Sequence, residues 1–278
     1  MKDVQANIGV VVTTYNSPAW LEKVLWGYEN QTDTNFQLLI ADDGSDEPTQ
    51  ELIETYKKSS TLNIEHIWHK DNGFRKTIIL NKVIANTSLP YLIFTDGDCI
   101  PKNDFIAAHR QRALPGHFLS GGYYKLEMTP SQAITRDDIQ SQRAFDFNWL
   151  HQQGQPKSFK RSKLTFGPTR RKLMEKITPT KATWNGMNSS AFTKGILAVN
   201  GFDERMQYGG LDREMGERMV NNGLKGIQIR YSAICLHLEH ARGYKTRETL
   251  EKNRQIRDTV KKERLIWSDY GIIKRKAD

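Results

Sequence analysis

The sequence predicts an α/β domain built around a parallel sheet, and three observations support this fold class. Short apolar runs rich in β-branched residues alternate with stretches of helical length through the first hundred residues. Acidic residues follow two of these runs, at the sheet edge where open α/β folds bind ligands. The chain of 278 residues is long enough to bury a substantial core, either as one large α/β domain or as one domain with an appended subdomain.

The first hundred residues read as strands alternating with helices. Residues 8–14 form a continuous β-branched run, which is typical of a parallel strand buried on both faces. Pro18 and Pro48 are expected to begin helices, because proline fits the first helical turn. We expect strands at 8–14, 36–41, 63–68 and 91–95, and helices from 18, at 48–59 and at 77–85. Residues 1–101 are therefore predicted to form a nucleotide-binding half-sheet.

The second half of the chain is less regular. We expect helices at 104–113 and 131–151, strands at 118–126 and 227–238, an ordered segment at 184–192 and a helix after Gly210. Residues 157–183 lack a helical period and contain Gly167, Pro168 and Pro179. They are therefore predicted to be a basic loop that could close over substrates.

The formal charge of +9 is concentrated in two segments. Residues 157–176 hold eight Lys or Arg against one Glu, and residues 242–278 hold twelve against six acidic residues. Residues 246–267 have a helical composition with a sparse apolar stripe. We predict one domain at 1–240, with halves 1–101 and 102–240, followed by a basic helical tail at 241–278.

This charge pattern bears on the partners of the protein. No RNA-binding or helix-turn-helix signature accompanies the basic residues, so nucleic acid is not the expected partner. An anionic membrane surface fits the two basic segments better, and the alternative is a merely solvated basic face.

The sequence also suggests a compartment. No apolar stretch approaches the roughly 20 residues needed to span a bilayer. Residues 1–7 lack the apolar core of a signal peptide, which predicts a cytoplasmic protein, able to lie on the inner face of the membrane. Cys99 and Cys235 form no C-x-x-C pair and are expected to be reduced core thiols.

Two carboxylates stand one residue apart at the end of the strand expected at 91–95. Asp96 and Asp98 would deliver hard oxygen ligands to the carboxyl edge of the sheet. Gly97 between them keeps the backbone slim enough for a phosphate to approach. The motif predicts a metal-nucleotide site, with an ordinary solvated acidic turn as the alternative.

Polar residues also follow the first two strands. Tyr15 and the carboxylate of Asp43 can supply a ring and an acceptor for a nucleobase. Asn16 and Asp43 can equally be ordinary turn formers. Arg75 and Lys76 are candidates for contacting a diphosphate or base, with surface charge as the alternative. The candidate donor-binding residues are Thr13, Tyr15, Asn16, Asp43, Arg75, Lys76, Asp96, Gly97 and Asp98.

These motifs resemble a known family. Residues 10–16 (VVVTTYN), 40–45 (IADDGS) and 95–98 (TDGD) are similar, in order and spacing, to the family 2 glycosyltransferases of the GT-A fold. Residues 184–188 (WNGMN), 200–204 (NGFDE) and 208–214 (YGGLDRE) resemble the galactosyltransferase-type C-terminal module of chondroitin-polymerase-like enzymes. The two matches together cover roughly residues 8–240.

The resemblance implies roles for the donor-side residues. Thr13, Tyr15 and Asp43 would hold the nucleoside, with Arg75 or Lys76 assisting. Asp96 would touch the ribose or the metal, and Asp98 would ligate a divalent cation, either carboxylate being able to take the direct ligand role. The late metal-binding histidine of the family matches His237, or less well His240, and the two are not expected to face the same way at a strand end. Manganese, or magnesium, is the expected ion.

The resemblance also implies a catalytic base and an acceptor site. Asp212 matches the family's catalytic Asp, at a helix start whose dipole is expected to keep it ionised, and the alternative is a helix cap. Leu211 replaces the acidic residue that usually precedes this Asp, and Glu214 could compensate or act as the base. The expected sugar-binding residues are Trp184, Asn185, Gly210 and Leu211, with Trp184 either stacking on a sugar or lying in the core.

These features together predict an inverting, metal-dependent glycosyltransferase. The expected donor is a nucleotide sugar, a UDP-hexose or UDP-N-acetylhexosamine, and the expected acceptor is a glycan or glycolipid of the lipopolysaccharide-core or capsule type. One alternative is a nucleotidyltransferase, although the Gly-rich, Lys-containing signature after the first strand is absent. The other is a catalytically inactive glycan-binding or scaffold protein.

Overall fold

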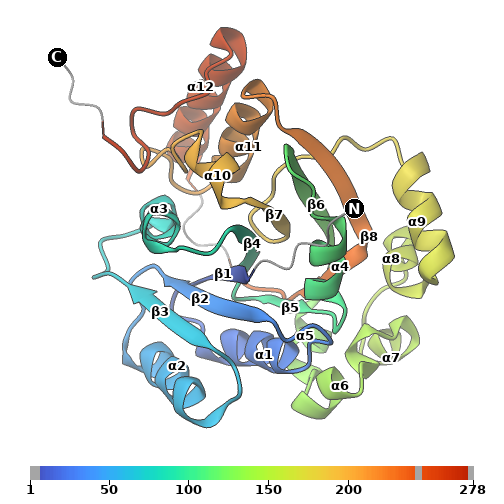
Figure 1. The fold of residues 1–278 in the computed structure, drawn as a ribbon. Helices are drawn as coiled ribbons and strands as arrows, with labels where there is room; N and C mark the ends of the chain where they lie inside the picture. Colours follow the sequence, from blue (N-terminus) through green and yellow to red (C-terminus); the bar gives the residue numbers. More distant parts are fainter. Residues whose placement is uncertain (1–6, 242–245, 275–278) are drawn as a thin grey trace.

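The fold is a single mixed sheet covered by helices on both faces (Figure 1). The computed structural model describes residues 7–241 and 246–274. The eight strands lie in the order β3-β2-β1-β4-β7-β6-β8-β5. Their bounds are β1 Ile8–Thr14, β2 Phe36–Asp42, β3 Ile64–Trp68, β4 Tyr91–Asp96, β5 Cys99–Pro101, β6 His117–Lys125, β7 Ser189–Phe192 and β8 Lys225–His237. Strands β3, β2, β1 and β4 are parallel, as expected for the half-sheet, whereas β7 runs antiparallel to β4 and β6.

The helices form two covering layers. In Figure 1, α1 and α2 lie on one side of the half-sheet, and α3, α10 and α11 lie on the other. Their bounds are α1 Pro18–Glu29, α2 Glu47–Ser59, α3 Lys76–Asn86, α4 Phe105–Arg112, α5 Met128–Ala133, α6 Arg136–Gln140, α7 Phe147–Gln152, α8 Ser162–Thr165, α9 Pro168–Ile177, α10 Thr193–Leu197, α11 Leu211–Asn221 and α12 Arg247–Glu263, with 3₁₀ turns η1 Arg143–Phe145 and η2 Phe159–Arg161.

Strand β1 divides the interior into two cores. Val10 and Val12 belong to the core on the α1 side, which also contains Leu21 and Val24. Val11 belongs to the core on the opposite face, with residues of α3 and α11. The period of two along a strand explains this division, since successive side chains point to opposite faces. The expectation of a strand buried on both sides is confirmed.

The prediction of a single helix at 131–151 is wrong. The chain forms α5, α6, η1 and α7 there instead. Thr135 makes a capping box with Asp138 and starts α6, and the Asp146 side chain accepts the Asn148 N–H at the start of α7. Gln142 has a left-handed backbone, φ 61°, which ends the preceding turn. Local hydrogen bonds from side chains to the backbone therefore restart the helix twice.

The basic loop expected at 157–183 is also largely helical. It contains η2, α8 and α9, and Pro168 lies in the first turn of α9 rather than breaking a helix. The one residue that α9 buries is Glu175, whereas Leu173 and Ile177 are exposed. The sequence therefore showed no helical period of hydrophobic residues here, because α9 does not bury an apolar stripe.

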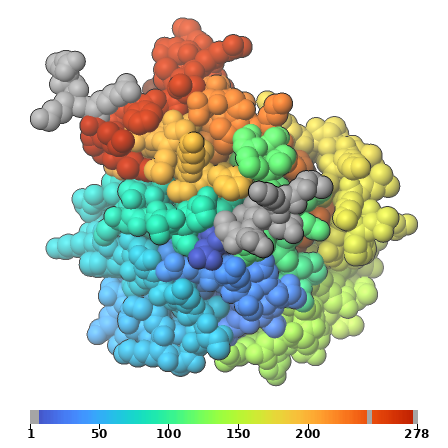
Figure 2. Space-filling model, viewed as in Figure 1, coloured from blue at the N-terminus to red at the C-terminus, as the bar shows by residue number. Residues whose placement is uncertain are grey.

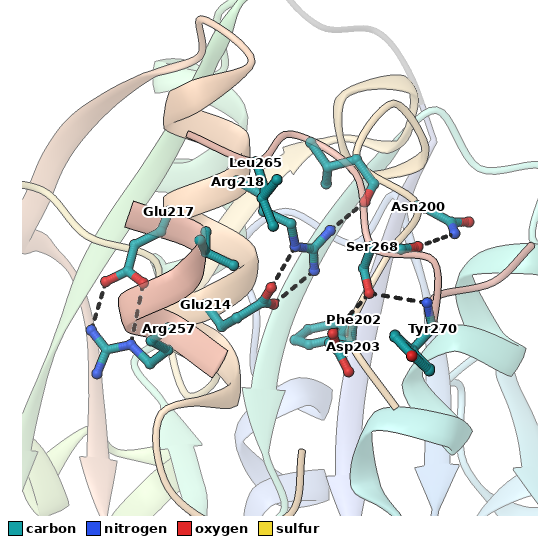
Figure 3. Close-up of polar contacts among 12 residues, drawn as sticks. Asn200, Phe202, Asp203, Glu214, Glu217, Arg218, Arg257, Leu265, Ser268 and Tyr270 are labelled. Carbon is teal, nitrogen blue, oxygen red and sulfur yellow. Dashed lines mark hydrogen bonds and ion pairs between the residues drawn. The ribbon is translucent and has the colours of Figure 1, made fainter. Parts of the chain in front are cut away.

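The C-terminal segment folds back onto the body of the domain. Helix α12 ends at Glu263, earlier than the expected 267, and residues 242–245 and 275–278 of the predicted tail lie outside the described residues. Figure 3 shows Ser268 donating from Oγ to Asp203 Oδ2 at 2.9 Å, and Asn200 Nδ2 donating to the Ser268 carbonyl at 2.7 Å. These contacts fasten the segment after α12 to the loop that follows α10.

A buried ion pair inside α11 anchors the same region (Figure 3). Arg218 is fully buried and donates to both carboxylate oxygens of Glu214, at 2.6 and 2.7 Å. Its guanidinium also donates to the carbonyls of Val199 and Gly201. All these donors and acceptors are satisfied internally, which offsets the cost of burying the two charges.

We expect Arg218→Met to destabilise the protein by about 3–5 kcal/mol, because it leaves the Glu214 carboxylate buried without its partner. The double variant Glu214→Met, Arg218→Met is expected to recover much of this loss, since it buries no unpaired charge. Urea unfolding measures both. Glu217→Gln is the control, because its partner Arg257 is partly exposed, and it should cost less than about 1 kcal/mol. An equal loss in Arg218→Met and the control would contradict the interpretation.

Candidate active site

A cavity of about 820 Å³ opens at the carboxyl ends of β1, β2 and β4. The start of α11 and the end of β8 complete its walls. This is the edge at which open α/β sheets bind ligands, and the volume suits a nucleotide-sized molecule. Of the residues predicted from the sequence, the cavity is lined by Thr13, Tyr15, Asn16, Asp43, Lys76, Asp96, Gly97, Asp98, Gly210, Leu211, Asp212, His237 and His240.

Asp96 lines this cavity and is held by two hydrogen-bond donors. The parallel register of β1 and β4 sets Thr13 beside Asp96, and the Thr13 hydroxyl donates to Asp96 Oδ1 at 2.7 Å. Lys76 at the start of α3 donates from Nζ to the same oxygen at 2.6 Å. Burial alone would lower the pKa of Lys76. The negative charges of Asp96 and Asp212 outweigh this effect, so the pKa of Lys76 is raised. Lys76 is thus a fixed cation among three carboxylates rather than a surface charge.

Gly97 is required by a close approach of two strands. Its N–H donates to the Thr13 carbonyl at 2.7 Å, and a Cβ at this position would lie 2.9 Å from that oxygen. The nearest Thr14 side-chain atoms would be 3.3 Å away. Any side chain at this position would therefore push the turn away from β1. The backbone contact with β1 thus requires glycine here, in addition to the predicted approach of a phosphate.

Asp98 lies beside two histidines from a distant part of the chain. Strand β5 pairs antiparallel with β8, so that Cys99 lies opposite His237, and the Leu238 N–H donates to the Asp98 carbonyl. Nε2 of His240 is 3.0 Å from Asp98 Oδ2. Although burial opposes ionisation, the hydrogen bond from His240 and the proximity of His237 lower the pKa of Asp98.

The expectation that only one of these histidines faces the site is wrong. The rings of His237 and His240 stack with centroids 5.6 Å apart, and both line the cavity. Strand β8 ends at His237, so the residues after it no longer alternate between the two faces.

The side chains around Asp98 fit a divalent cation. A carboxylate oxygen of Asp98, a ring nitrogen of His237 and the Cys99 sulfur lie within 4.8 Å of one another. His237 is only 4% exposed, and its Nδ1 is a buried polar atom without a hydrogen-bond partner. Burial raises the pKa of Cys99, which keeps the thiol protonated and makes it a poor ligand. Asp98 and His237 could each give a ligand to a divalent cation, and the His240 imidazole lies beside them.

The opposite end of the cavity carries the residues predicted for the nucleoside. The Tyr15 ring is 49% exposed, and its hydroxyl donates to Asp71 at 3.2 Å. Asp43 Oδ1 is 2.8 Å from His69 Nε2, and its Oδ2 accepts the Arg75 N–H at 2.9 Å. Burial raises the pKa of Asp43, and the Arg75 N–H and His69 oppose this shift. Arg75 thus contributes its backbone, and its side chain is not part of the cavity lining.

Asn16 forms a turn as well as lining the cavity. It has a left-handed backbone, φ 45°, and its side-chain oxygen accepts the Asp46 N–H at 2.8 Å. Its own N–H donates to the Ser45 hydroxyl. Both interpretations of this residue are therefore compatible, because the turn places it at the mouth of the site.

Asp212 points into the cavity from the first turn of α11. The helix cap is Gly210, with φ 85°, so the Asp212 side chain is not the cap. Burial raises its pKa to about 6, against the opposing effect of Lys76, so the helix dipole does not dominate as expected. A Cβ on Gly186 would lie 2.6 Å from Asp212 Oδ1, and that oxygen is buried without a hydrogen-bond partner. An unpartnered carboxylate oxygen with a raised pKa is suited to accept a proton.

Three predicted site residues belong to the packing instead. Trp184 is completely buried, and its ring centroid lies 5.4 Å from that of Phe94, so it cannot stack on a sugar. Asn185 donates to the Asn188 carbonyl at 3.1 Å and is not part of the cavity lining. Glu214 is fully buried in its ion pair with Arg218 and cannot be the base.

Several aromatic and apolar residues of the cavity were not among the site residues predicted from the sequence. They are Trp20, Phe74, Tyr123, Met187 and Tyr208. The rings of Phe74 and Tyr208 meet edge to face, 6.1 Å apart, although they are far apart in the sequence. A weak signal existed for both, since Phe74 follows the turn glycine Gly73 and Tyr208 precedes Gly209.

Helix α12 fixes the loop that leads into Asp212. Asn253 of this helix is almost completely buried. Its Nδ2 donates to the carbonyls of Gln207, Tyr208 and Gly209, at 3.0, 3.1 and 2.7 Å. Because Tyr208 and Asp212 both line the cavity, the C-terminal helix positions one wall of the site.

We expect Asn253→Asp to destabilise this wall by about 1–3 kcal/mol, since a side chain of the same shape would set a carboxylate against three carbonyl oxygens. Thermal melting measures the loss of stability, and ligand titration shows whether the cavity is affected. Arg254→Ala on the exposed side of α12 is the control and should change neither. An Asn253→Asp protein as stable as the wild type would contradict the role of this contact.

Known proteins share both sequence and fold with this chain. The family described as glycosyl transferase family 2 matches residues 9–173. Hyaluronan synthase of Pasteurella multocida is 32% identical over 95 residues, 34% of this chain and 10% of that protein. Chondroitin synthase of Escherichia coli is 27% identical over 105 residues, 37% of this chain and 15% of that protein. The chain thus spans only a small part of these relatives.

Solved structures of low identity share the fold. The mannosyltransferase PcManGT from Pyrobaculum calidifontis, in complex with GDP-Man and Mn²⁺, has a TM-score of 0.58 at 15% identity, covering 86% of this chain and 59% of that one. S. aureus TarS 1-349, in complex with UDP-GlcNAc, has a TM-score of 0.55 at 14% identity, covering 86% and 60%. The expected GT-A fold is confirmed. Because the family match covers more than half of the chain, the protein belongs to glycosyl transferase family 2.

Proposed function

We propose that this protein is an inverting, metal-dependent glycosyltransferase that moves a hexose or N-acetylhexosamine from a UDP-sugar to a hydroxyl of a cell-surface glycan. The observation that supports this best is the meeting of Asp98, His237 and Asp212 at one cavity. These residues come from three distant parts of the chain, and each has a different task in sugar transfer. Hyaluronan and chondroitin synthases among the relatives support a glycan as the acceptor.

The donor lies across the parallel half of the sheet in this proposal. Tyr15 and Asp43 hold the nucleoside, and Asp96, tied to Thr13 and Lys76, lies nearer the ribose. Asp98 with His237 and His240 holds the cation, which when bound neutralises charge on the departing diphosphate. The positive charge of Lys76 adds to that neutralisation. Neighbouring structures with GDP-Man and Mn²⁺ and with UDP-GlcNAc support a nucleotide-sugar donor and a divalent ion.

Asp212 acts as the base. Its carboxylate takes the proton from the acceptor hydroxyl as the hydroxyl oxygen attacks the anomeric carbon and the bond to the diphosphate breaks. A single attack of this kind inverts the anomeric centre. Tyr208, Gly210 and Leu211 form the adjacent wall, and Tyr208 offers an aromatic face for a sugar in place of the buried Trp184.

The protein is proposed to work in the cytoplasm, at the anionic inner surface of the membrane. The described residues contain no helix long and apolar enough to cross a bilayer. The segment with α8 and α9, yellow in Figure 2, forms one flank of the molecule and exposes Phe159, Leu173 and Ile177 among its cations. Apolar and cationic side chains on one exposed surface suit a lipid interface.

Thermal denaturation with a panel of nucleotide sugars tests the donor assignment. We expect a UDP-sugar at about one hundred times its dissociation constant to stabilise the protein by about 2.7 kcal/mol, and only with Mn²⁺ or Mg²⁺ present. GDP- and ADP-sugars are the matched controls for the base. Equal stabilisation by all nucleotides, or by none, would contradict the proposal.

A further inference from the structure

A lysine of residues 157–176, called the basic segment here, lies beside the cavity on the side of β6. Lys163 of α8 donates from Nζ to the carbonyl of Tyr123 at 2.9 Å, and the same atom lies 5.2 Å from the centre of the Tyr123 ring. Tyr123 lines the cavity, and its ring centroid is 5.9 Å from that of His237. One aromatic ring therefore separates the ammonium of Lys163 from the candidate metal centre.

Lys163 follows Lys160 of η2 by three residues, and its helix α8 packs against β8, the strand that carries Arg230. Lys160, Lys163 and Arg230 are called the cluster below. Burial, followed by repulsion from Arg230 and Lys160, lowers the pKa of Lys163 to about 8. Within residues 7–241 and 246–274, no carboxylate forms an ion pair with any of these three side chains. Arg230 donates from Nε to the neutral amide of Gln228 at 3.1 Å. The three cations thus lie on adjoining elements, and no described carboxylate pairs with them.

The surrounding backbone maintains this arrangement. The pairing of β6 with β8 shifts between Gly121 and Gly122, where a bulge displaces residues 230–233 of β8. A Cβ on Gly122 would lie 2.0 Å from the Arg230 carbonyl, so glycine is needed for the bulge to pack. The fixed bulge determines where the Arg230 side chain leaves the sheet.

The one acidic residue of the basic segment does not reach the cluster. Glu175 is only 8% exposed and accepts the N–H groups of Tyr231 and Ser232, at 3.3 and 2.9 Å. Arg112 occupies its other carboxylate oxygen at 2.6 Å. The bonds of Glu175 are therefore used in fastening α9 to β8 and α4, and none of the carboxylates that the structure describes forms an ion pair with the cluster.

We propose that Lys160, Lys163 and Arg230 bind a phosphate group of the acceptor, so that the substrate is a phosphorylated glycan or phosphoglycolipid. This inference rests on the proposed function. A phosphate dianion matches three cations better than a single carboxylate does, and lysine binds phosphate as a point charge. The donor diphosphate is assigned to Asp98 and its histidines, on the other side of Tyr123, so the two anions do not compete for one site.

Direct binding of a phosphomonoester tests the proposal without donor or metal. The probe is sn-glycerol 3-phosphate, titrated in EDTA at constant ionic strength against protein whose lysines carry ¹³C-methyl groups. We expect the resonances of Lys160 and Lys163 to shift saturably, and we expect the Lys163 signal to be missing in Lys163→Gln. Affinity should fall at least about fivefold in Lys163→Gln and in Arg230→Gln. Far-UV circular dichroism checks that both variants are folded.

Lys172→Gln is the matched control, since it removes the same charge from an exposed position on α9. An equal loss of affinity in this control would overturn the proposal in favour of general electrostatics, and so would the absence of saturable binding. Vesicles of phosphatidylcholine with and without phosphatidic acid distinguish the sources of phosphate. Binding to phosphatidic acid vesicles that is weakened by Lys163→Gln supports a phospholipid-linked acceptor. Vesicle binding without binding of the soluble ester would overturn the site in favour of a membrane surface.

The result is separable from failure of the proposed function. The phosphomonoester titration contains neither nucleotide sugar nor cation, whereas the donor assignment is tested by thermal denaturation with both. Loss of the donor response with phosphate binding intact would leave an anion site on a protein of another function. Loss of phosphate binding with the donor response intact would remove only the acceptor class.

Discussion

Asp98→Asn is expected to lower sugar transfer by about 10²–10³-fold, with the fold intact. Asparagine keeps the shape of the side chain but removes the negative charge that both histidines face. The cation would then be held by neutral ligands, and the diphosphate would depart with less of its charge neutralised. Release of UDP from a UDP-sugar measures the rate, and thermal denaturation with Mn²⁺ measures the loss of metal binding.

Asp104→Asn is the matched control for this change. Asp104 is an acidic residue in a surface ion pair with Lys102, away from the cavity, and its replacement should leave the rate and the metal response unchanged. Full activity in Asp98→Asn would contradict the assignment of the metal centre. If the wild type bound a nucleotide sugar but never released UDP, the alternative of an inactive glycan-binding protein would be favoured.

Asp212→Asn is expected to lower the rate of sugar transfer by about 10²–10⁴-fold, while donor binding persists. The asparagine amide cannot take the proton of the acceptor hydroxyl, whereas the cation and nucleoside contacts that we propose do not involve this side chain. Glu217→Gln on the same helix is the control, because Glu217 pairs with Arg257 and is not part of the cavity lining. Retained turnover in Asp212→Asn would transfer the role of base to another group.

The pH dependence of the wild type follows from the same residue. Burial raises the pKa of Asp212 to about 6, so the carboxylate is protonated below that pH and ionised above it. Since the base must be ionised to accept a proton, transfer should rise with pH through about 6 and then level off. A bound cation would move this limb to lower pH. A rate that falls as pH rises through 6 would contradict the assignment.

Several site residues could be predicted because their chemistry is local. A β-branched run ending in Asp96-Gly97-Asp98 places carboxylates at a strand end whatever follows in the chain, and Asp212 follows a glycine pair at a helix start. Trp184 could not be assigned in this way, since the same aromatic residue serves a core as well as a sugar site. The prediction of Glu214 as a possible base was wrong for a related reason. Its burial depends on Arg218 and on the loop after α10, which are not evident from its own position in the sequence.

The sequence by itself determined the parallel half-sheet and its carboxylate edge, because these depend on short-range periodicity and on strand ends. The resemblance of its motifs to known enzymes indicated the family. Only the tertiary structure decided which histidines meet Asp98, since the pairing of β5 with β8 joins residues far apart in the chain. It also decided that Asn253 supports the loop before Asp212 and that Lys163 lies beside Tyr123. Contacts of this kind arise from packing between distant segments, which no local pattern encodes.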